Sequence, residues 1–298
     1  MLQITQDFKN KARKALLDQR VNFDGSDESY ARKWGINKSV YSRLKGGEVD
    51  GILKESQWLN IGRELGVSLG DRSFHAAKTD VYKTIEEEVS FCQEHSKAMI
   101  FVDDVEIGKT FTVKHLSLSR PNCFYIPCSD ARSKILFTKL LAKTIGLDNT
   151  GKYADIKANI KYYLKMLPNP VILLDDGGYL HDEVFVDLNE YWNSTENICG
   201  WYMIGDDSLQ LKIEKSITSK KIGFRAFFSR YSSNFSRVTP FERTEKIMFY
   251  KKLITDVLSV NMTDRSNLSA IVNRCLVQGD TGQIGGLRRA ESLLILNS

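Results

Sequence analysis

The sequence predicts an α/β protein in which helices flank a parallel sheet, with a small all-helical module before it and a helical segment after it. Short apolar runs alternate with helical patterns between about residues 75 and 240, the order expected of a doubly wound sheet. The stretches before and after it have helical periodicity alone. We therefore expect three domains, at residues 1–74, 75–240 and 241–298.

The composition argues against several classes of protein. The 298 residues are 42% hydrophobic, enough for a sizeable core, yet no apolar run reaches the ~20 residues of a membrane span. The N-terminus has no signal-peptide pattern, and the five cysteines are scattered and odd in number, so we expect reduced thiols and a cytoplasmic protein. The four histidines form no ligand spacing with cysteine, which argues against zinc. A net charge of +5 permits a nucleic-acid partner without requiring one.

The N-terminal module contains two short predicted helices joined by a turn at Gly35. The second helix, residues 38–45, is expected to bury Val40 and Leu44. Its free face would present Lys38, Ser39, Ser42 and Arg43. This pattern resembles the repressor-type helix-turn-helix family, which implies that the second helix contacts DNA in the major groove. The alternative is a helical protein-interaction bundle whose lysines are simply solvated. A further helix is expected at about 53–65, and a linker at 66–75.

The central motif is the stretch from Ala98 to Phe111, where an apolar strand leads through acidic residues to Gly108-Lys109-Thr110 and a helical pattern. Strand, phosphate loop and helix in this order allow backbone N–H groups to surround a triphosphate. Lys109 would reach the outer phosphates, and the Thr110 hydroxyl would bind magnesium. The predicted ATP-binding residues of this loop are Val105, Glu106, Ile107, Gly108, Lys109, Thr110 and Phe111.

Three more strands are predicted at 123–128, 171–174 and 200–204. Asp175 and Asp176 follow the second of these, and Asp206 follows the third. Because parallel strands end at one edge of a sheet, these carboxylates should meet the Lys109 loop. Asp175 would hold Mg²⁺ through water, Asp176 would orient the attacking water, and Asp206 would sense the terminal phosphate.

Over residues 79–298 the chain resembles the AAA+ ATPases, and more closely the branch that contains the phage Mu transposition protein B, TnsC and IstB. The resemblance rests on the motifs above, on the turn at 128–134, on Phe228-Ser229-Arg230-Tyr231 and on the ending Gly285-Gly286-Leu287-Arg288. It implies that an arginine reaches the nucleotide of the neighbouring subunit, with Arg230 preferred over Arg225 and Arg237. It also implies a lid arginine, Arg288, on the phosphates. For the turn after the second strand it implies contact with the DNA backbone, through Arg132, Ser133 and Lys134; the alternative is an ordinary exposed turn.

The resemblance implies an ATP-dependent regulator of DNA transposition that assembles on double-stranded DNA as a ring or filament and delivers the target to a transposase. ATP and Mg²⁺ would be its cofactors, and a bacterial host or a mobile element would encode it. One alternative is a helicase loader, and another is a non-enzymatic, nucleotide-sensing transcription repressor.

The sequence departs from the family pattern at several positions of the site. Asp103 and Glu106 stand where glycine is usual, and a carboxylate beside a triphosphate repels it. Asp176 replaces glutamate and Asp206 replaces asparagine. We therefore expect weak, slow hydrolysis, with ATP acting mainly as a switch for assembly.

Overall fold

The computed structural model describes residues 4–23, 25–67, 75–262, 264–277 and 285–296. The chain divides into two compact units, residues 1–73 and 74–298, and each is described by itself. Most of the predicted linker at 66–75 lies outside the described residues. In the part of the chain that the structure describes, no helix is both long enough and apolar enough to span a membrane.

The N-terminal unit is a small helical bundle. Its α-helices are α1 (Gln6–Gln19), α2 (Asp27–Lys33), α3 (Lys38–Lys45) and α4 (Glu55–Glu64). The Ser26 side chain accepts a hydrogen bond from the Ser29 amide and so begins α2 as expected of a cap. Trp58, Tyr30 and Tyr41 are almost fully buried in one apolar cluster, with Leu16 and Leu44 beside them. Tyr41, rather than the predicted Val40, is the buried partner of Leu44, and Val40 only packs partly buried against this cluster.

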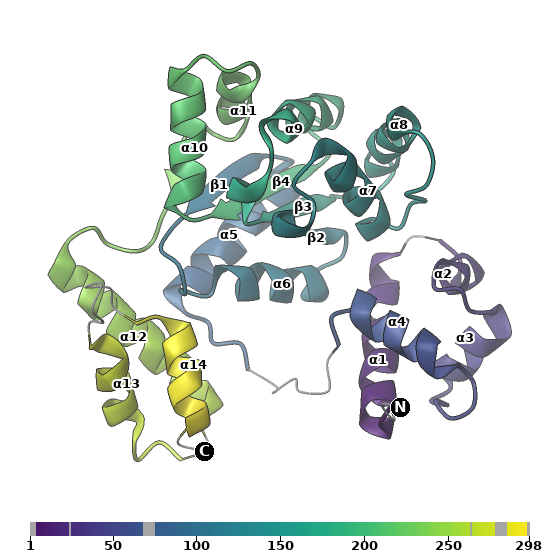
Figure 1. The fold of residues 1–298 in the computed structure, drawn as a ribbon, viewed down its shortest axis with the longest axis horizontal. Coiled ribbons are helices and arrows are strands. Elements are labelled where there is room, and N and C mark those ends of the chain that lie inside the picture. Colours follow the sequence, from purple (N-terminus) through teal and green to yellow (C-terminus); the bar gives the residue numbers. More distant parts are fainter. Residues whose placement is uncertain (1–3, 24, 68–74, 263, 278–284, 297–298) are drawn as a thin grey trace. The chain divides into compact units, whose positions relative to one another are not determined.

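The second unit is built on a five-stranded, entirely parallel sheet, as predicted for the α/β fold class (Figure 1). Its strands are β1 (Ala98–Val102), β2 (Cys123–Pro127), β3 (Val171–Asp175), β4 (Gly200–Gly205) and β5 (Phe235–Ser236). Their order in the sheet is β2-β3-β4-β1-β5. The central strands are apolar up to Asp175, the last residue of β3, as expected when both faces of a sheet are covered.

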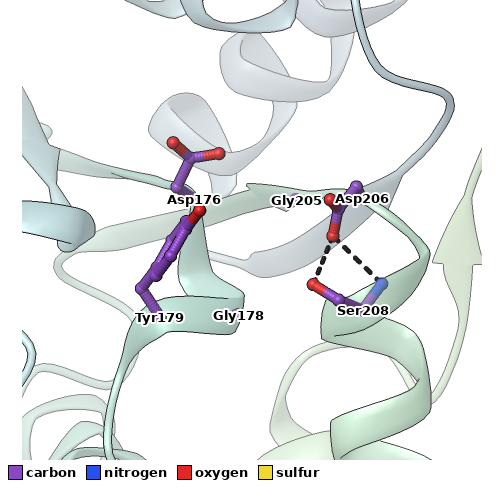
Figure 2. Close-up of a pocket in the computed structure, with 6 residues that line it drawn as sticks. All are labelled: Asp176, Gly178, Tyr179, Gly205, Asp206 and Ser208. Carbon is purple, nitrogen blue, oxygen red and sulfur yellow. Dashed lines mark hydrogen bonds between the residues drawn. The ribbon is translucent and has the colours of Figure 1, made fainter.

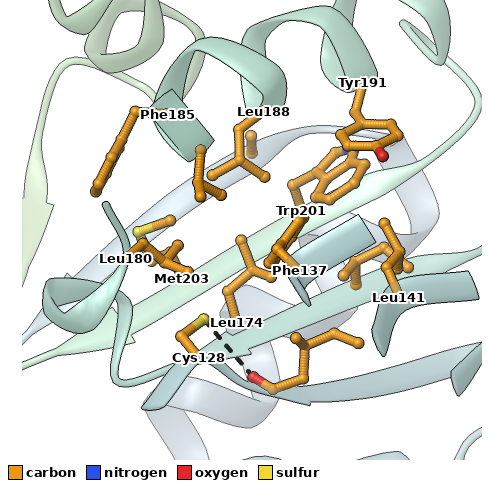
Figure 3. Packing of buried hydrophobic residues seen from close by; sticks show 14 of the residues in the cluster. Cys128, Phe137, Leu141, Leu174, Leu180, Phe185, Leu188, Tyr191, Trp201 and Met203 are labelled. Atoms are coloured by element: carbon orange, nitrogen blue, oxygen red, sulfur yellow. Dashed lines mark hydrogen bonds between the residues drawn. The ribbon is translucent and has the colours of Figure 1, made fainter. Parts of the chain in front are cut away.

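Helices cover both faces of this sheet (Figure 1). One face carries α5 (Asp80–His95) and α6 (Lys109–Ser119). The other face carries α7 (Lys134–Thr144), α8 (Tyr153–Leu164), α9 (Asp182–Ser194), α10 (Asp207–Thr218) and α11 (Phe224–Arg230). Figure 3 shows part of this larger core, where Leu174 and Met203 of the sheet face Leu188 of α9. Trp201 stacks on Tyr191 with ring centroids 6.0 Å apart.

After the sheet, the described residues form the helices α12 (Arg243–Asn261), α13 (Leu268–Leu276) and α14 (Leu287–Leu296). They share an apolar cluster of their own, which contains Ile254, Leu258, Ile271, Val272 and Leu293. We call α12–α14 the C-terminal helical segment. Because its helices pack on one another, this segment has a core of its own next to the main one.

The sequence did not predict β5, α10 or α11. β5 is only two residues long and pairs with Ile100 and Phe101 of β1, so it forms no apolar run of its own. It nevertheless matters for the site, because the residues just after it contact the loop that follows β1.

Glu88 of α5 gives a pH-dependent prediction for this fold. Its carboxylate accepts hydrogen bonds from the Tyr202 hydroxyl, at 2.7 Å, and from the Ser236 hydroxyl. Burial raises the Glu88 pKa above its usual range. A raised pKa in the folded state means that the folded chain binds the proton more tightly than the unfolded chain does. Protonated Glu88 therefore stabilises the folded state. This stabilisation is fully present below the ordinary glutamate pKa and is lost as the pH rises through the raised Glu88 pKa.

We expect Glu88→Gln to be more stable than the wild type at neutral pH and to flatten the fall of melting temperature between mildly acidic and neutral pH. Thermal unfolding across that range measures it, with Glu94→Gln, on an exposed position of the same helix, as the control. An unchanged pH profile in Glu88→Gln would show that Glu88 is not the titrating group.

Candidate functional site

The strand order places a topological switch point at the carboxyl ends of β1 and β4, and we call this place the β1–β4 crevice. These two strands are neighbours in parallel register, with Val102 opposite Gly205. The chain leaves β1 toward β2 at one edge of the sheet, and it leaves β4 in the opposite direction toward β5. In open α/β sheets, ligands bind where neighbouring connections diverge in this way. The predicted phosphate loop and Asp206 both begin at this point.

The loop between β1 and α6 is held by two consecutive carboxylates. Asp103 is fully buried, and its Oδ2 accepts hydrogen bonds from the amides of Val238, at 2.8 Å, and Thr239, at 3.0 Å. The Asp104 carboxylate accepts from Arg237, at 2.6 Å, and from Tyr250, at 3.1 Å. Both carboxylates are therefore bound by donors of this chain.

This arrangement corrects one sequence expectation. Asp103 was expected to repel a triphosphate, but its carboxylate is buried and bound to two backbone amides on the β5 side. It therefore anchors the loop. Glu106, which stands where glycine is usual, has a φ of 62°, a left-handed conformation that is costly for any residue other than glycine, and Gly108 has a φ of 96°. Val105 and Phe111 are exposed, whereas Ile107 is buried in the core.

Lys109 is the first residue of α6, at the positive end of the helix. Its ammonium donates to the carbonyl oxygens of Asp103, at 2.7 Å, and of Asp104. Burial lowers the Lys109 pKa, and the nearby carboxylates of Asp103, Asp206, Asp104 and Asp176 act in the opposite direction. Lys109 therefore points back onto its own loop, and it would have to leave these carbonyls to reach a phosphate.

Thr110 and Asp175 meet across the crevice. The Thr110 hydroxyl donates to Asp175 Oδ1 at 3.1 Å, and the Tyr125 hydroxyl donates to Asp175 Oδ2 at 2.7 Å. A hydroxyl and a buried carboxylate are oxygen ligands of the kind that Mg²⁺ takes, together with waters and phosphates. Among the described residues there is no group of three or more His, Cys, Asp or Glu side chains that could hold a metal ion by itself. These two residues thus fit an ion held largely by a bound phosphate.

Asp176 and Asp206 line one pocket at the ends of β3 and β4 (Figure 2). Tyr179 and Ser208 complete its walls with Gly178 and Gly205. The Asp206 carboxylate accepts from the Ser208 amide at 3.0 Å and from its hydroxyl, which fixes it at the start of α10. The pKa of Asp176 is raised, mainly because its carboxyl is partly buried and also because the negative charges of Asp175 and Asp206 lie nearby. The positive charges of Lys109 and Arg288 act in the opposite direction.

The C-terminal helical segment also reaches this loop. The Leu287 amide donates to the Glu106 carbonyl at 2.8 Å. Gly286 lies so close that an added Cβ would be 2.4 Å from Glu106 Cβ. Arg288 is 3.9 Å from the Glu106 carboxylate and its side chain is 83% exposed. Arg288 therefore lies beside the loop and remains free to turn toward a ligand.

The three candidate arginines for a neighbouring subunit differ in their surroundings. Arg237 pairs with Asp104, and with Asp207 at 3.3 Å, so it is held inside its own chain. Arg230 donates to Asn193 Oδ1 at 2.7 Å and lies over the Trp192 ring. Arg225 is exposed and makes neither a hydrogen bond nor an ion pair with any residue that the structure describes. Because Arg237 is paired within its own chain, Arg225 and Arg230 remain the candidates for an arginine that reaches a neighbouring subunit.

The two predicted DNA-contacting groups are exposed to different extents. Arg132 is exposed and lies over the Tyr179 ring at 5.0 Å, while Ser133 and Lys134 are half-buried, with Lys134 3.6 Å from Glu183. In the N-terminal unit the face of α3 is open as predicted. Two of its cations already have acidic neighbours: Lys38 lies 3.6 Å from Glu28, and Arg43 lies 2.6 Å from Glu48. Ser39 and Ser42 on that face are exposed.

Sequence reasoning missed Tyr125, Tyr179 and Tyr250 as parts of the site. Tyr125 lies inside β2, and its orientation toward Asp175 follows from the register of β2 against β3. Strand alternation could have found it, because the side chains of neighbouring parallel strands align. Tyr250 lies 146 residues from its partner Asp104, and no local pattern links them.

No protein-family model matches the chain, and no curated protein is similar enough to count as a relative.

Replacing Asp103 by the glycine usual at this position should destabilise the protein. The change leaves the amides of Val238 and Thr239 without their acceptor, at a cost of about 2–5 kcal/mol for one part-buried and one buried donor. Denaturant unfolding measures the loss, and Asp103→Asn, which keeps one acceptor oxygen, should lose less. Wild-type stability in Asp103→Gly would contradict the anchoring role.

Proposed function

We propose that this chain is an AAA+-type ATPase that binds ATP and Mg²⁺ at the carboxyl edge of its sheet and hydrolyses ATP slowly. The observation that supports this best is the contact between Thr110, the residue after Lys109 in α6, and Asp175 at the end of β3, with Thr110 Oγ1 3.1 Å from Asp175 Oδ1. A lysine at a helix N-terminus, after a left-handed glycine, is suited to bind terminal phosphates. The fully parallel sheet with helices on both faces is the scaffold that such a site requires.

In this proposal each residue has a limited task. Lys109 releases the carbonyls of Asp103 and Asp104 and binds the outer phosphates. Thr110 and Asp175 hold Mg²⁺, which neutralises charge that develops on the phosphates. Asp176, whose pKa is raised, accepts a proton from the attacking water. Its side chain is one methylene shorter than glutamate, which supports slow hydrolysis.

Self-association is part of the same proposal. A γ-phosphate at the edge of the crevice needs cations from more than one side, and a guanidinium can bind it in bidentate fashion. Arg288 would supply one from the same chain, and Arg230 or Arg225 would supply another from the neighbouring copy. ATP would in this way join subunits into a ring or a filament.

We further propose that the assembled protein binds double-stranded DNA, marks it as the target for a transposase, and thereby regulates DNA transposition. This step rests on the resemblance of the motifs to the branch of phage Mu transposition protein B, TnsC and IstB. Arg132 supports it, because its exposed guanidinium suits contact with the phosphate backbone.

One observation favours a second candidate, a nucleotide-sensing transcription repressor. The N-terminal residues form a compact unit of their own, with Ser39 and Ser42 exposed between the cations of α3. Footprinting separates the two functions, because a repressor protects one palindromic site whether or not neighbouring copies assemble. The other alternative is a helicase loader. It would be distinguished by binding a helicase, whereas the proposed regulator would bind a transposase.

Lys109→Ala should strongly weaken ATP binding while leaving the fold intact. Removing the ammonium takes away the main cation at the outer phosphates, so affinity for a fluorescent ATP analogue with Mg²⁺ should fall at least about 100-fold, or ~2.7 kcal/mol. Lys83→Ala, on an exposed position of α5, is the matched control and should bind as the wild type does. If Lys109→Ala and the control bind the ATP analogue with equal affinity, the proposed ATP site is wrong.

Arg132→Ala should weaken ATP-dependent binding to duplex DNA. Loss of one phosphate contact reduces the slope of log affinity against log salt concentration by about 1, with little dependence on DNA sequence. Filter binding at several salt concentrations measures this, again with Lys83→Ala as control. An unchanged slope, or protection of a single site without ATP, would count against the proposed DNA contact.

A further inference from the structure

Asp104 contacts both sides of the junction between the sheet and the C-terminal helical segment. Its Oδ1 accepts from Arg237, at 2.6 Å, which lies just after β5. Its Oδ2 accepts from Lys246 and, at 3.1 Å, from Tyr250, which are one turn apart on α12. The Asp104 side chain is only 13% exposed, so these charge-assisted contacts are weakly screened.

The junction itself is short. Asp103 holds the chain as far as Thr239, and α12 begins at Arg243. Residues 240–242 are therefore the covalent joint between a segment fixed to the sheet and a helix fixed to Asp104. If α12 turns about this joint, the contacts of Asp104 with Lys246 and Tyr250 break while the contact with Arg237 can persist.

Movement of α12 would carry Arg288 with it. Ile254 and Leu258 of α12 share a buried cluster with Ile271 of α13 and Leu293 of α14, so the three helices are expected to move together. Leu287, at the start of α14, contacts Glu106 of the phosphate loop, and Arg288 follows it. The position of α12 thus decides where Arg288 lies relative to the crevice.

Asp104 is also in contact with Lys109. The Lys109 ammonium donates to the Asp104 backbone carbonyl, while the Asp104 carboxylate holds α12. When Lys109 leaves this carbonyl for a phosphate, the residue that holds the helical segment loses a partner. Tyr250 and Leu253 also pack in the apolar cluster of α5, but such contacts are non-directional and tolerate rotation better than hydrogen bonds do.

We propose that Asp104 is a positioning residue that fixes the C-terminal helical segment over the phosphate loop and transmits the movement of Lys109 to it. This inference rests on the proposed function, since the ligand that moves Lys109 is the nucleotide. Asp104 acts through Lys246, Tyr250 and the loop, and it does not touch the reacting phosphate. Its carboxylate sets the place of Arg288, and through it the affinity for nucleotide.

The test uses the full chain and two readouts. Asp104→Asn keeps the size of the side chain and removes its charge, and Lys246→Met removes the partner on α12. In the absence of nucleotide, we expect either change to raise amide hydrogen exchange in α12 and α14 about tenfold relative to the wild type. We expect each to weaken binding of a fluorescent ATP analogue with Mg²⁺ about tenfold. The double variant should be no worse than the more severe single one, because both remove the same contact.

Asp80→Asn is the matched control, since it removes the ion pair of 2.5 Å between Lys252 of α12 and α5 without touching the loop. It should leave exchange and affinity within about twofold of the wild type. The inference is overturned if Asp104→Asn and Lys246→Met leave the exchange of α12 and α14 unchanged, or if Asp80→Asn raises it equally. A wild type that binds no nucleotide, with exchange that still responds to Asp104→Asn, would refute the proposed function and leave the positioning contact standing.

Discussion

A buried carboxylate bound by backbone amides is the constraint on which the candidate site depends. Asp103 is fully buried, yet it retains strong hydrogen bonds because Val238 and Thr239 present consecutive N–H groups to it. Leaving either partner unmatched would be costly, so the loop after β1 and the segment after β5 must stay together. These hydrogen bonds fix the start of the loop. Because the loop is held there, it can keep the strained φ of 62° at Glu106, and Lys109 follows at the start of α6.

The carboxyl edge of the sheet also brings together the site carboxylates that follow other strands. Parallel strands bring Asp175 and Asp206 to one side, and the connections that follow β1 and β4 run in opposite directions. Tyr125 and Thr110 each donate to one oxygen of Asp175, which holds that carboxylate in a single orientation. Oxygen ligands, a lysine and a helix N-terminus are together suited to phosphate and magnesium, and less so to an apolar ligand.

Much of this arrangement was predictable from the sequence because its signals are local. The apolar runs of β1, β3 and β4 were expected, and α3 occupies its predicted residues 38–45. The gathering of Lys109, Asp175 and Asp206 follows from parallel strands alone. The partners of Asp103 were not predictable, since Val238 lies 135 residues away and no periodicity links them. β5 was missed because two residues carry no pattern. The sequence also gave no sign that Arg237 forms ion pairs within its own chain, with Asp103, Asp104 and Asp207.

Lys109, Thr110 and Asp175 are proposed to bind a nucleotide together with Mg²⁺. The most direct test is a crystal structure at saturating concentrations of a non-hydrolysable ATP analogue and MgCl₂. We expect a triphosphate over the loop, the Lys109 ammonium moved from the Asp103 carbonyl to a phosphate oxygen, and a metal ion beside the Thr110 hydroxyl. An empty crevice with Lys109 still bound to the Asp103 carbonyl would contradict it.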